Sequence, residues 1–134
     1  MKNLTFIILL LILTFSCNKE SNEISLCDKL EGVWRAESYT EDGVEFVPGS
    51  IQSFEADFDK LSDSKGDIQF KYIYDDGSTV IFQGNYVPNS TCNEMDITFK
   101  NVATFSMDFT YIGEKLNIEG NIDGYSVKIK LKRT

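Results

Sequence analysis

The chain has 134 residues, the length of one domain, and its 21 acidic and 13 basic side chains give a formal net charge of -8. So acidic a surface repels nucleic-acid phosphates, and we expect no nucleic-acid partner. Histidine is absent, which excludes a Ser-His-Asp triad, a Cys-His pair and every His-ligated zinc or iron site. No nucleophile with an adjacent base is visible, so we expect neither an enzyme nor a cofactor.

The N-terminal segment has the layout of a secretory signal peptide. Lys2 precedes a run over residues 4–15 that is apolar except for Thr5 and Thr14. The run is too short for a transmembrane helix, which needs about 20 apolar residues, so cleavage is favoured over a retained anchor. We expect residues 1–16 to be removed, residues 17–29 to form a lipidated N-terminus and tether, and residues 30–134 to fold as one domain.

Two short motifs around Cys17 resemble those of bacterial lipoproteins. Leu13-Thr14-Phe15-Ser16-Cys17 resembles the lipobox, in which a small residue precedes the lipidated cysteine. The resemblance implies that Cys17 carries a diacylglyceryl thioether and, on its amine, an acyl chain such as palmitate. Asn18-Lys19-Glu20 resembles the export signal of surface-exposed lipoproteins of the Bacteroidota. Together they predict a lipid-anchored protein of the outer membrane, exposed at the cell surface.

After Val33, apolar and polar residues alternate with period two, which is typical of half-buried strands. The pattern predicts eight strands, at residues 33–40, 51–58, 67–74, 79–87, 95–100, 104–111, 115–119 and 125–132. Asp75-Asp76-Gly77 and Asp123-Gly124 supply the positive φ of tight hairpins. Residues 44–47 are interpreted as a loop with an extended middle, because Gly43, Pro48 and Gly49 flank them.

The alternation leaves one face apolar and the other polar, as in an antiparallel sheet with one solvated face. On the first strand it points Trp34, Ala36 and Ser38 inward. Short connections favour an up-and-down barrel over a sandwich, because closure removes exposed edges. We therefore predict an all-β fold, a small eight-stranded antiparallel barrel.

Residues 30–134 resemble the lipocalin-like domains of bacterial lipoproteins. Gly32-Val33-Trp34 stands where lipocalins carry Gly-x-Trp on the first strand, and Arg133 stands where they carry an arginine after the last strand. The resemblance implies a barrel of the lipocalin type and a small lipophilic ligand.

If eight strands alternate up and down, the first strand begins where the last one finishes. Trp34 and Arg133 then meet at the closed end, where the guanidinium can stack on the indole; a solvated terminal charge is the alternative for Arg133. Cys27 and the loop that holds Cys92 fall at this same end, so we expect them to form a disulfide. A ninth strand would place the two cysteines at opposite ends.

Four aspartates surround the turn between the second and third predicted strands: Asp57, Asp59, Asp63 and Asp67. Their spacing does not fit a calcium-binding loop, in which acidic residues alternate ahead of a glycine. We interpret the segment as a solvated acidic hairpin and predict no metal site.

The interior of an eight-stranded barrel is just wide enough to be filled by side chains or to hold one small ligand. One hypothesis is a non-catalytic binder of a small apolar or amphipathic ligand; the other is a solid-core module that contacts a protein or glycan through its loops, chiefly residues 41–50. The volume of the interior discriminates between them. For the first hypothesis, the predicted ligand-binding residues at the open end are Tyr72, Tyr74, Val80, Phe82, Phe99, Phe105 and Tyr125.

Overall fold

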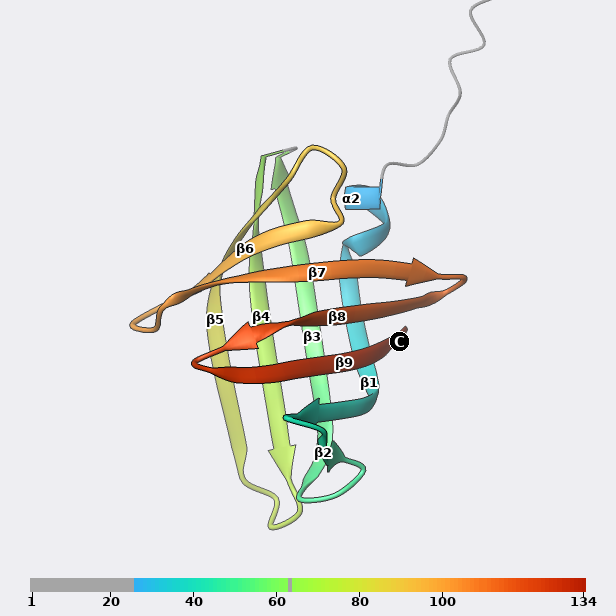
Figure 1. The fold of residues 1–134 in the computed structure, drawn as a ribbon, viewed down its shortest axis with the longest axis vertical. Helices are drawn as coiled ribbons and strands as arrows, with labels where there is room; N and C mark the ends of the chain where they lie inside the picture. Colours follow the sequence, from blue (N-terminus) through green and yellow to red (C-terminus); the bar gives the residue numbers. More distant parts are fainter. Residues whose placement is uncertain (1–25, 63) are drawn as a thin grey trace, which may run out of the picture.

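The computed structural model describes residues 26–62 and 64–134, which form one short helix and one antiparallel sheet (Figure 1). The expected signal peptide, Cys17 and most of the expected tether lie outside the described residues. Across these two ranges, no helix combines the length and the apolar character needed to cross a membrane. The elements are α2 (Leu26–Leu30), β1 (Gly32–Glu41), β2 (Val44–Val47), β3 (Ile51–Ser62), β4 (Lys65–Tyr74), β5 (Thr79–Pro88), β6 (Glu94–Phe99), β7 (Thr104–Ile112), β8 (Lys115–Ile122) and β9 (Tyr125–Arg133).

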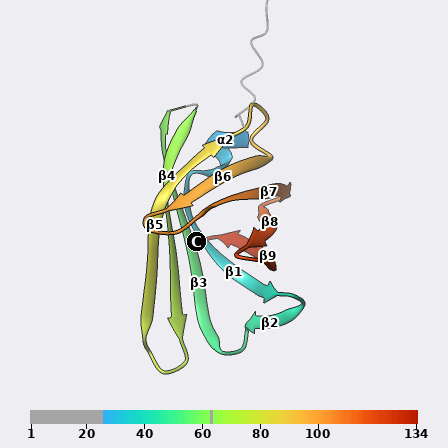
Figure 2. The same ribbon diagram turned by 60° about the vertical axis from the view of Figure 1, so that its left-hand side comes forward.

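Eight strands close into a barrel, which confirms the predicted fold class. From β3 to β9 each strand pairs with the next, and β1 pairs with β3 on one side and with β9 on the other. The long strands β3, β4 and β5 run across the direction of β7, β8 and β9 (Figure 1), and α2 lies at the end opposite β2 (Figure 2). We call the α2 end the closed end and the β2 end the open end.

The interpretation of residues 44–47 as a loop is wrong, because they form the strand β2. This strand pairs with the last residues of β1 through a two-residue hairpin at Asp42-Gly43, where Glu41 lies opposite Val44. The φ angles of Asp42 and Gly43 are 47° and 80°, the doubly positive combination that matches the twist of a tight hairpin. Asp123-Gly124 forms the same kind of turn, with φ of 53° and 90°. The sequence therefore held the same signal at both places.

The additional strand does not exchange the ends of the barrel. Both β2 and β3 run antiparallel to β1 and pair with different parts of its length. They therefore act as one interrupted strand beside β1, and the direction of every later strand is unchanged. The expectation that a ninth strand would separate the two cysteines fails for this reason.

A bulge in β1 changes which side chains point inward. In the pairing with β9, Ala36 lies opposite Leu131 but Ser38 lies opposite Lys130, so β1 has one extra residue between them. A bulge of this kind re-aims the side chains that follow it. The uninterrupted alternation expected through Ser38 ends here, and Tyr39 is buried at 2% exposure.

The closed half of the barrel has a filled core. Leu30 of α2 is 0% exposed, as are Leu116, Ile118 and Leu131 of the facing strands. Each such residue contributes about 1.5–3 kcal/mol to folding when it is fully buried. Buried aromatic rings add directional contacts, and the ring centroid of Phe58 lies 5.7 Å from that of Tyr86 and 5.9 Å from that of Phe109.

Arg133 and Trp34 seal the closed end, where the guanidinium carbon lies 4.6 Å from the centroid of the indole ring. Nη1 of Arg133 donates to the carbonyl of Glu31 at 2.8 Å, and Nη2 donates to the carbonyl of Lys29. Nε1 of Trp34 donates to the carbonyl of Leu30 at 2.7 Å. The two side chains thus satisfy carbonyl groups that a short helix leaves without partners at its C-terminal end. The predicted stacking is present.

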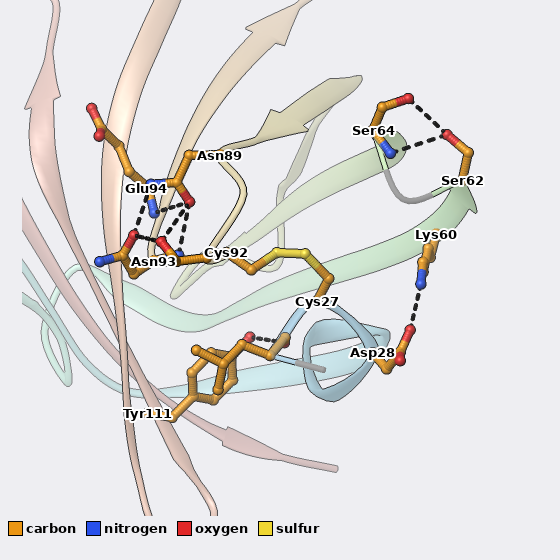
Figure 3. The surroundings of a disulfide bond; sticks show 12 residues. Cys27, Asp28, Lys60, Ser62, Ser64, Asn89, Cys92, Asn93, Glu94 and Tyr111 are labelled. Atoms are coloured by element: carbon orange, nitrogen blue, oxygen red, sulfur yellow. Dashed lines mark hydrogen bonds and ion pairs between the residues drawn. A yellow bond between two sulfur atoms is a disulfide. The ribbon is translucent and has the colours of Figure 1, made fainter. Parts of the chain in front are cut away.

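A disulfide joins Cys27 of α2 to Cys92 of the β5–β6 loop, as predicted, with the Cα atoms 5.4 Å apart (Figure 3). The hydroxyl of Tyr111 donates to the carbonyl of Leu26 at 2.9 Å, which ties the start of α2 to β7. α2 therefore packs on the barrel and lies across the boundary expected at residue 30. For a loop with a sequence separation of 65 residues, the cross-link contributes up to about 4 kcal/mol by restricting the unfolded chain.

Position 32 lies beside Arg133 at the closed end, where the backbone conformation and the close contact favour glycine. A substitution tests this. Gly32 has φ of 113°, and a Cβ there would lie 3.1 Å from Nη1 of Arg133. We expect Gly32→Ala to lower the free energy of unfolding by about 1–3 kcal/mol, because it adds a strained backbone to the displacement of the arginine. The emission of Trp34, the only tryptophan, should also shift.

Gly43→Ala is the matched control for this prediction. Gly43 also has a positive φ, of 80°, but a Cβ there would meet nothing within 4 Å. Gly43→Ala should therefore lower the free energy of unfolding through backbone strain alone and leave the tryptophan emission unchanged. Equal losses of stability with identical emission spectra would contradict the role given to Arg133.

Candidate functional site

The open half of the barrel contains a cavity of about 410 Å³, in contrast to the filled closed half. Small-molecule sites in proteins typically have volumes of about 300–1,000 Å³, so this one suits a small ligand. Residues of β1 to β8 and of the connections at the open end contribute to its wall. They are Tyr39, Glu41, Phe46, Ser50, Ile51, Phe70, Tyr72, Tyr74, Phe82, Phe99, Val102, Phe105, Ile122 and Asp123.

Aromatic rings from β1, β3, β4, β5 and β6 contact one another in a closed cycle, which we call the aromatic belt and which forms one side of the cavity wall. Neighbouring rings lie at centroid distances of 5.0–5.9 Å and meet edge-on or tilted, which is the favourable arrangement for aromatic pairs. Phe54, at 0% exposure, is the one ring of the belt that does not line the cavity. The belt runs through Tyr39, Tyr72, Phe82, Phe99, Phe70 and Phe54, and returns to Tyr39.

Among the described residues, the first half of β5 has no neighbouring strand on its β6 side, and the cavity is open to solvent there. This strand pairs with β6 only from Gly84 to Pro88, so its first half lies beyond that pairing. Phe82 is consequently 39% exposed although its ring contacts that of Phe99. A Cβ on Gly84 would lie 2.0 Å from the carbonyl oxygen of Thr98, so only glycine allows β5 and β6 to approach where their pairing begins.

Tyr39, Tyr72 and Glu41 place polar groups within the aromatic wall. The hydroxyl of Tyr39 donates to Oε1 of Glu41 at 2.6 Å. Burial, followed by the neighbouring Tyr72 and the bond to Glu41, raises the pKa of Tyr39 far above its usual value. Burial also raises the pKa of Tyr72 to about 12. Both hydroxyls are therefore neutral over the physiological range; that of Tyr39 donates to Glu41, and its oxygen can still accept a hydrogen bond.

Most of the predicted ligand-binding residues meet in this cavity. Tyr72, Tyr74, Phe82, Phe99 and Phe105 line it. Val80 and Tyr125 do not belong to the lining, and they are 38% and 54% exposed. Val80 lies close to the β4–β5 turn and Tyr125 begins β9, so both lie at the outer edge of the open end.

Sequence reasoning missed several lining residues on β1, β2 and the end of β8. Tyr39 and Glu41 follow the bulge in β1, which no glycine or proline marks in the sequence. Phe46 belongs to β2, which the Asp-Gly hairpin signal could have revealed. Ile122 lies in the part of β8 that extends beyond the predicted end of that strand at residue 119.

The acidic hairpin lies on the outer surface, away from the cavity. Asp59 of β3 lies directly opposite Asp67 of β4, and Asp57 lies opposite Gln69. Asp63 lies outside the described residues. Within residues 26–62 and 64–134, no group of three or more cysteine or acidic side chains is arranged to hold a metal ion.

Solved structures of other β-barrels resemble this fold. No protein family matches the sequence, and no curated protein matches it either. Among solved structures, a redesigned β-barrel, mFAP1, bound to DFHBI, is 18% identical, with a TM-score of 0.59 over 80% of this chain and 97% of that one. Lobster apocrustacyanin A1 is 16% identical, with a TM-score of 0.57 over 80% of this chain and 62% of that one. The siderocalin Ex-FABP is 10% identical, with a TM-score of 0.58 over 79% of this chain and 74% of that one.

The barrel has a lipocalin-like fold. At identities this low, the likeness concerns the fold alone. Within that fold, residues of this chain form both the closed end and the cavity at the opposite end.

The buried tyrosines of this lipocalin-like barrel predict a loss of stability in alkaline solution. Tyrosine ionises near pH 10 in an unfolded chain, whereas Tyr72 has a pKa of about 12 in the folded one. Between these values the folded state binds more protons, so the free energy of unfolding falls as pH rises above about 10 and is unaffected by this group below about 9. Denaturant midpoints measured across this range check the prediction.

Tyr72→Phe removes the titrating hydroxyl and should make the decline above about pH 10 less steep. Tyr125→Phe, at a residue that is 54% exposed and outside the cavity, is the matched control and should leave the decline as it is. A decline of the same steepness in both variants would contradict the assignment to the cavity.

Proposed function

We propose that the protein is a non-catalytic binder that holds one small lipophilic or amphipathic ligand in the cavity at the open end of its barrel. The cavity itself carries this proposal, because about 410 Å³ of space walled by aromatic side chains remains where a solid core would be filled. Side chains fill the closed half of the same barrel, as is usual in protein interiors. The open half departs from this packing, which supports a role for the space it leaves.

Similar structures support a binding role. The mFAP1 barrel is bound to DFHBI, and the siderocalin Ex-FABP is described as having dual ligand specificities. Both have the same lipocalin-like architecture as this chain. The belt of aromatic rings gives the cavity a rigid apolar wall, and a preformed wall reduces the entropy lost on binding.

We propose further that the protein is an outer-membrane lipoprotein anchored through Cys17 and facing the cell surface. The lipobox-like sequence before Cys17 and the polar residues after it support this localisation. The chain enters the barrel at α2, so an anchor at Cys17 would attach at the closed end. The mouth of the cavity would then lie on the side away from the membrane, open to ligands in solution.

A second candidate function is an interaction module whose loops contact a protein or glycan. It is favoured by exposed apolar side chains near the mouth, since grouped apolar residues at a surface mark interaction sites. Grafting an unrelated loop over residues 41–50 would abolish capture of such a partner. The exposed residues are Val44, Val80, Ile81, Val102 and Tyr125.

A lipophilic fluorescent probe tests binding in the cavity. Ser50 lines the mouth and is exposed, so Ser50→Trp would place an indole in the cavity without disturbing the core. We expect N-phenylnaphthylamine to bind the unmodified protein with increased emission, and Ser50→Trp to weaken that binding by about tenfold or more. Ser90→Trp, at an exposed serine of the closed end, is the matched control and should bind as the unmodified protein does.

Absence of probe binding to the unmodified protein would contradict the proposed function. Equal binding by Ser50→Trp and the unmodified protein would show that the probe binds elsewhere.

The proposed anchor has its own test. Cys17→Ala should abolish incorporation of labelled palmitate and release the protein from the outer-membrane fraction, because a protein without acyl chains has no stable anchor. In cells that produce the unmodified protein, digestion of intact cells with a protease reports whether the protein is exposed at the surface. Unchanged labelling of Cys17→Ala would contradict lipidation at this residue.

A further inference from the structure

The charged side chains that line the cavity are all acidic. Among its described lining residues, Glu41 and Asp123 carry charge, and lysine and arginine are not represented. The hydroxyl of Tyr39 occupies Oε1 of Glu41 at 2.6 Å, so Oε2 can accept from a ligand. A charged ligand head would therefore meet carboxylates and hydroxyls at the mouth.

The segments around the mouth add further negative charge. The segments that border the mouth are residues 41–50, which include the end of β1 and all of β2, and the connections 75–78, 100–103 and 123–124; Lys100 is their single basic residue. A concave site bordered by one sign of charge raises the local concentration of ligands of the opposite sign and lowers that of ligands of the same sign. The acidic residues of these segments are Glu41, Asp42, Glu45, Asp75, Asp76 and Asp123.

The two lining carboxylates come from adjacent parts of the barrel. Glu41 lies opposite Val127 in the pairing of β1 with β9. The amide of Asp42 donates to the carbonyl of Ser126 at 2.8 Å, and the amide of Ser126 donates to Oδ1 of Asp42 at 2.8 Å. These bonds hold the β1–β2 hairpin against the β8–β9 hairpin that bears Asp123.

Aromatic rings beside Glu41 complete a cation-binding environment. The ring of Tyr39 lies 6.2 Å from that of Phe46 and 5.9 Å from that of Tyr72, and both pairs meet nearly at right angles. A cation within about 6 Å of an aromatic face is attracted by the electrons of the ring. A carboxylate in the same place would lose its hydration without gaining an oppositely charged partner, which is costly.

We infer that the cavity selects ligands with a protonated amine, with the apolar body against the aromatic belt and the ammonium group near Glu41 and Asp123, and that it rejects carboxylates of the same size. This inference rests on the proposed function, since it names the chemical class of ligand for the same cavity.

Three probes that share one apolar body and differ in the head group test the inference. They are phenylbutylamine, phenylbutanol and phenylbutyrate, measured by displacement of N-phenylnaphthylamine from the purified full chain. We expect the amine to bind more tightly than the alcohol, and the carboxylate to bind about tenfold or more weakly than the amine. Added salt should reduce the difference, because it screens the charges around the mouth.

Variants assign the preference to the lining carboxylates. Glu41→Gln and Asp123→Asn remove one charge each while keeping the size of the side chain, and together they should bring the affinities of the amine and the carboxylate close to that of the alcohol. Glu45→Gln removes the same charge from the neighbouring strand β2 at a residue outside the lining, and it should keep most of the preference.

The outcomes separate this inference from the proposed function. Equal affinities for the three probes, or a preference for phenylbutyrate, would overturn the inference while the bound alcohol still supports a ligand cavity. A preference for the amine that survives Glu41→Gln combined with Asp123→Asn would also overturn it. Failure of the fluorescent probe itself to bind would overturn the proposed function, and the inference with it.

Discussion

β1 and β9, the first and last strands of the barrel, pair along most of their length, from Trp34 opposite Arg133 to Glu41 opposite Val127. This pairing turns the sheet into a closed barrel and removes the edges that an open sheet would expose. At one end it brings Arg133 over the indole of Trp34 and within reach of the carbonyl groups at the end of α2. The seal at the closed end and the cavity at the open end both depend on this single contact between strands.

The same pairing contains the irregularity that shapes the cavity. One extra residue in β1 between Ala36 and Ser38 turns Tyr39 toward the interior. Tyr39 then completes the aromatic belt, and its hydroxyl holds Glu41 at the mouth. The core of the closed half is filled, and about 410 Å³ remains open in the other half. The two hypotheses of a filled barrel and a hollow barrel therefore each describe one half of the molecule.

The uneven distribution of charge links the fold to the proposed ligand. The chain has a formal net charge of -8, and the connections at the open end carry several carboxylates against the single ammonium of Lys100. At the closed end Arg133 interacts with the indole and with backbone carbonyls, so its charge is engaged far from the mouth. The aromatic belt explains why an apolar body would enter the cavity, and the carboxylates explain which head group it would carry.

Local patterns in the sequence determined much of this structure, because their physical effect requires no distant partner. Alternation with period two predicted the strands, and Asp123-Gly124 predicted a tight hairpin. The count of these strands then placed Cys27 and Cys92 at the same end of the barrel, although they are 65 residues apart. Asp42-Gly43 carried an equally local signal for β2, which the flanking proline and glycines concealed. By contrast, the bulge in β1, the inward position of Tyr39 and the volume of the cavity were decided by tertiary structure. The bulge and the position of Tyr39 arise where β1 meets β9, a strand about a hundred residues further along the chain, and no local pattern records how two such strands register. The cavity volume depends on side chains brought together from eight strands.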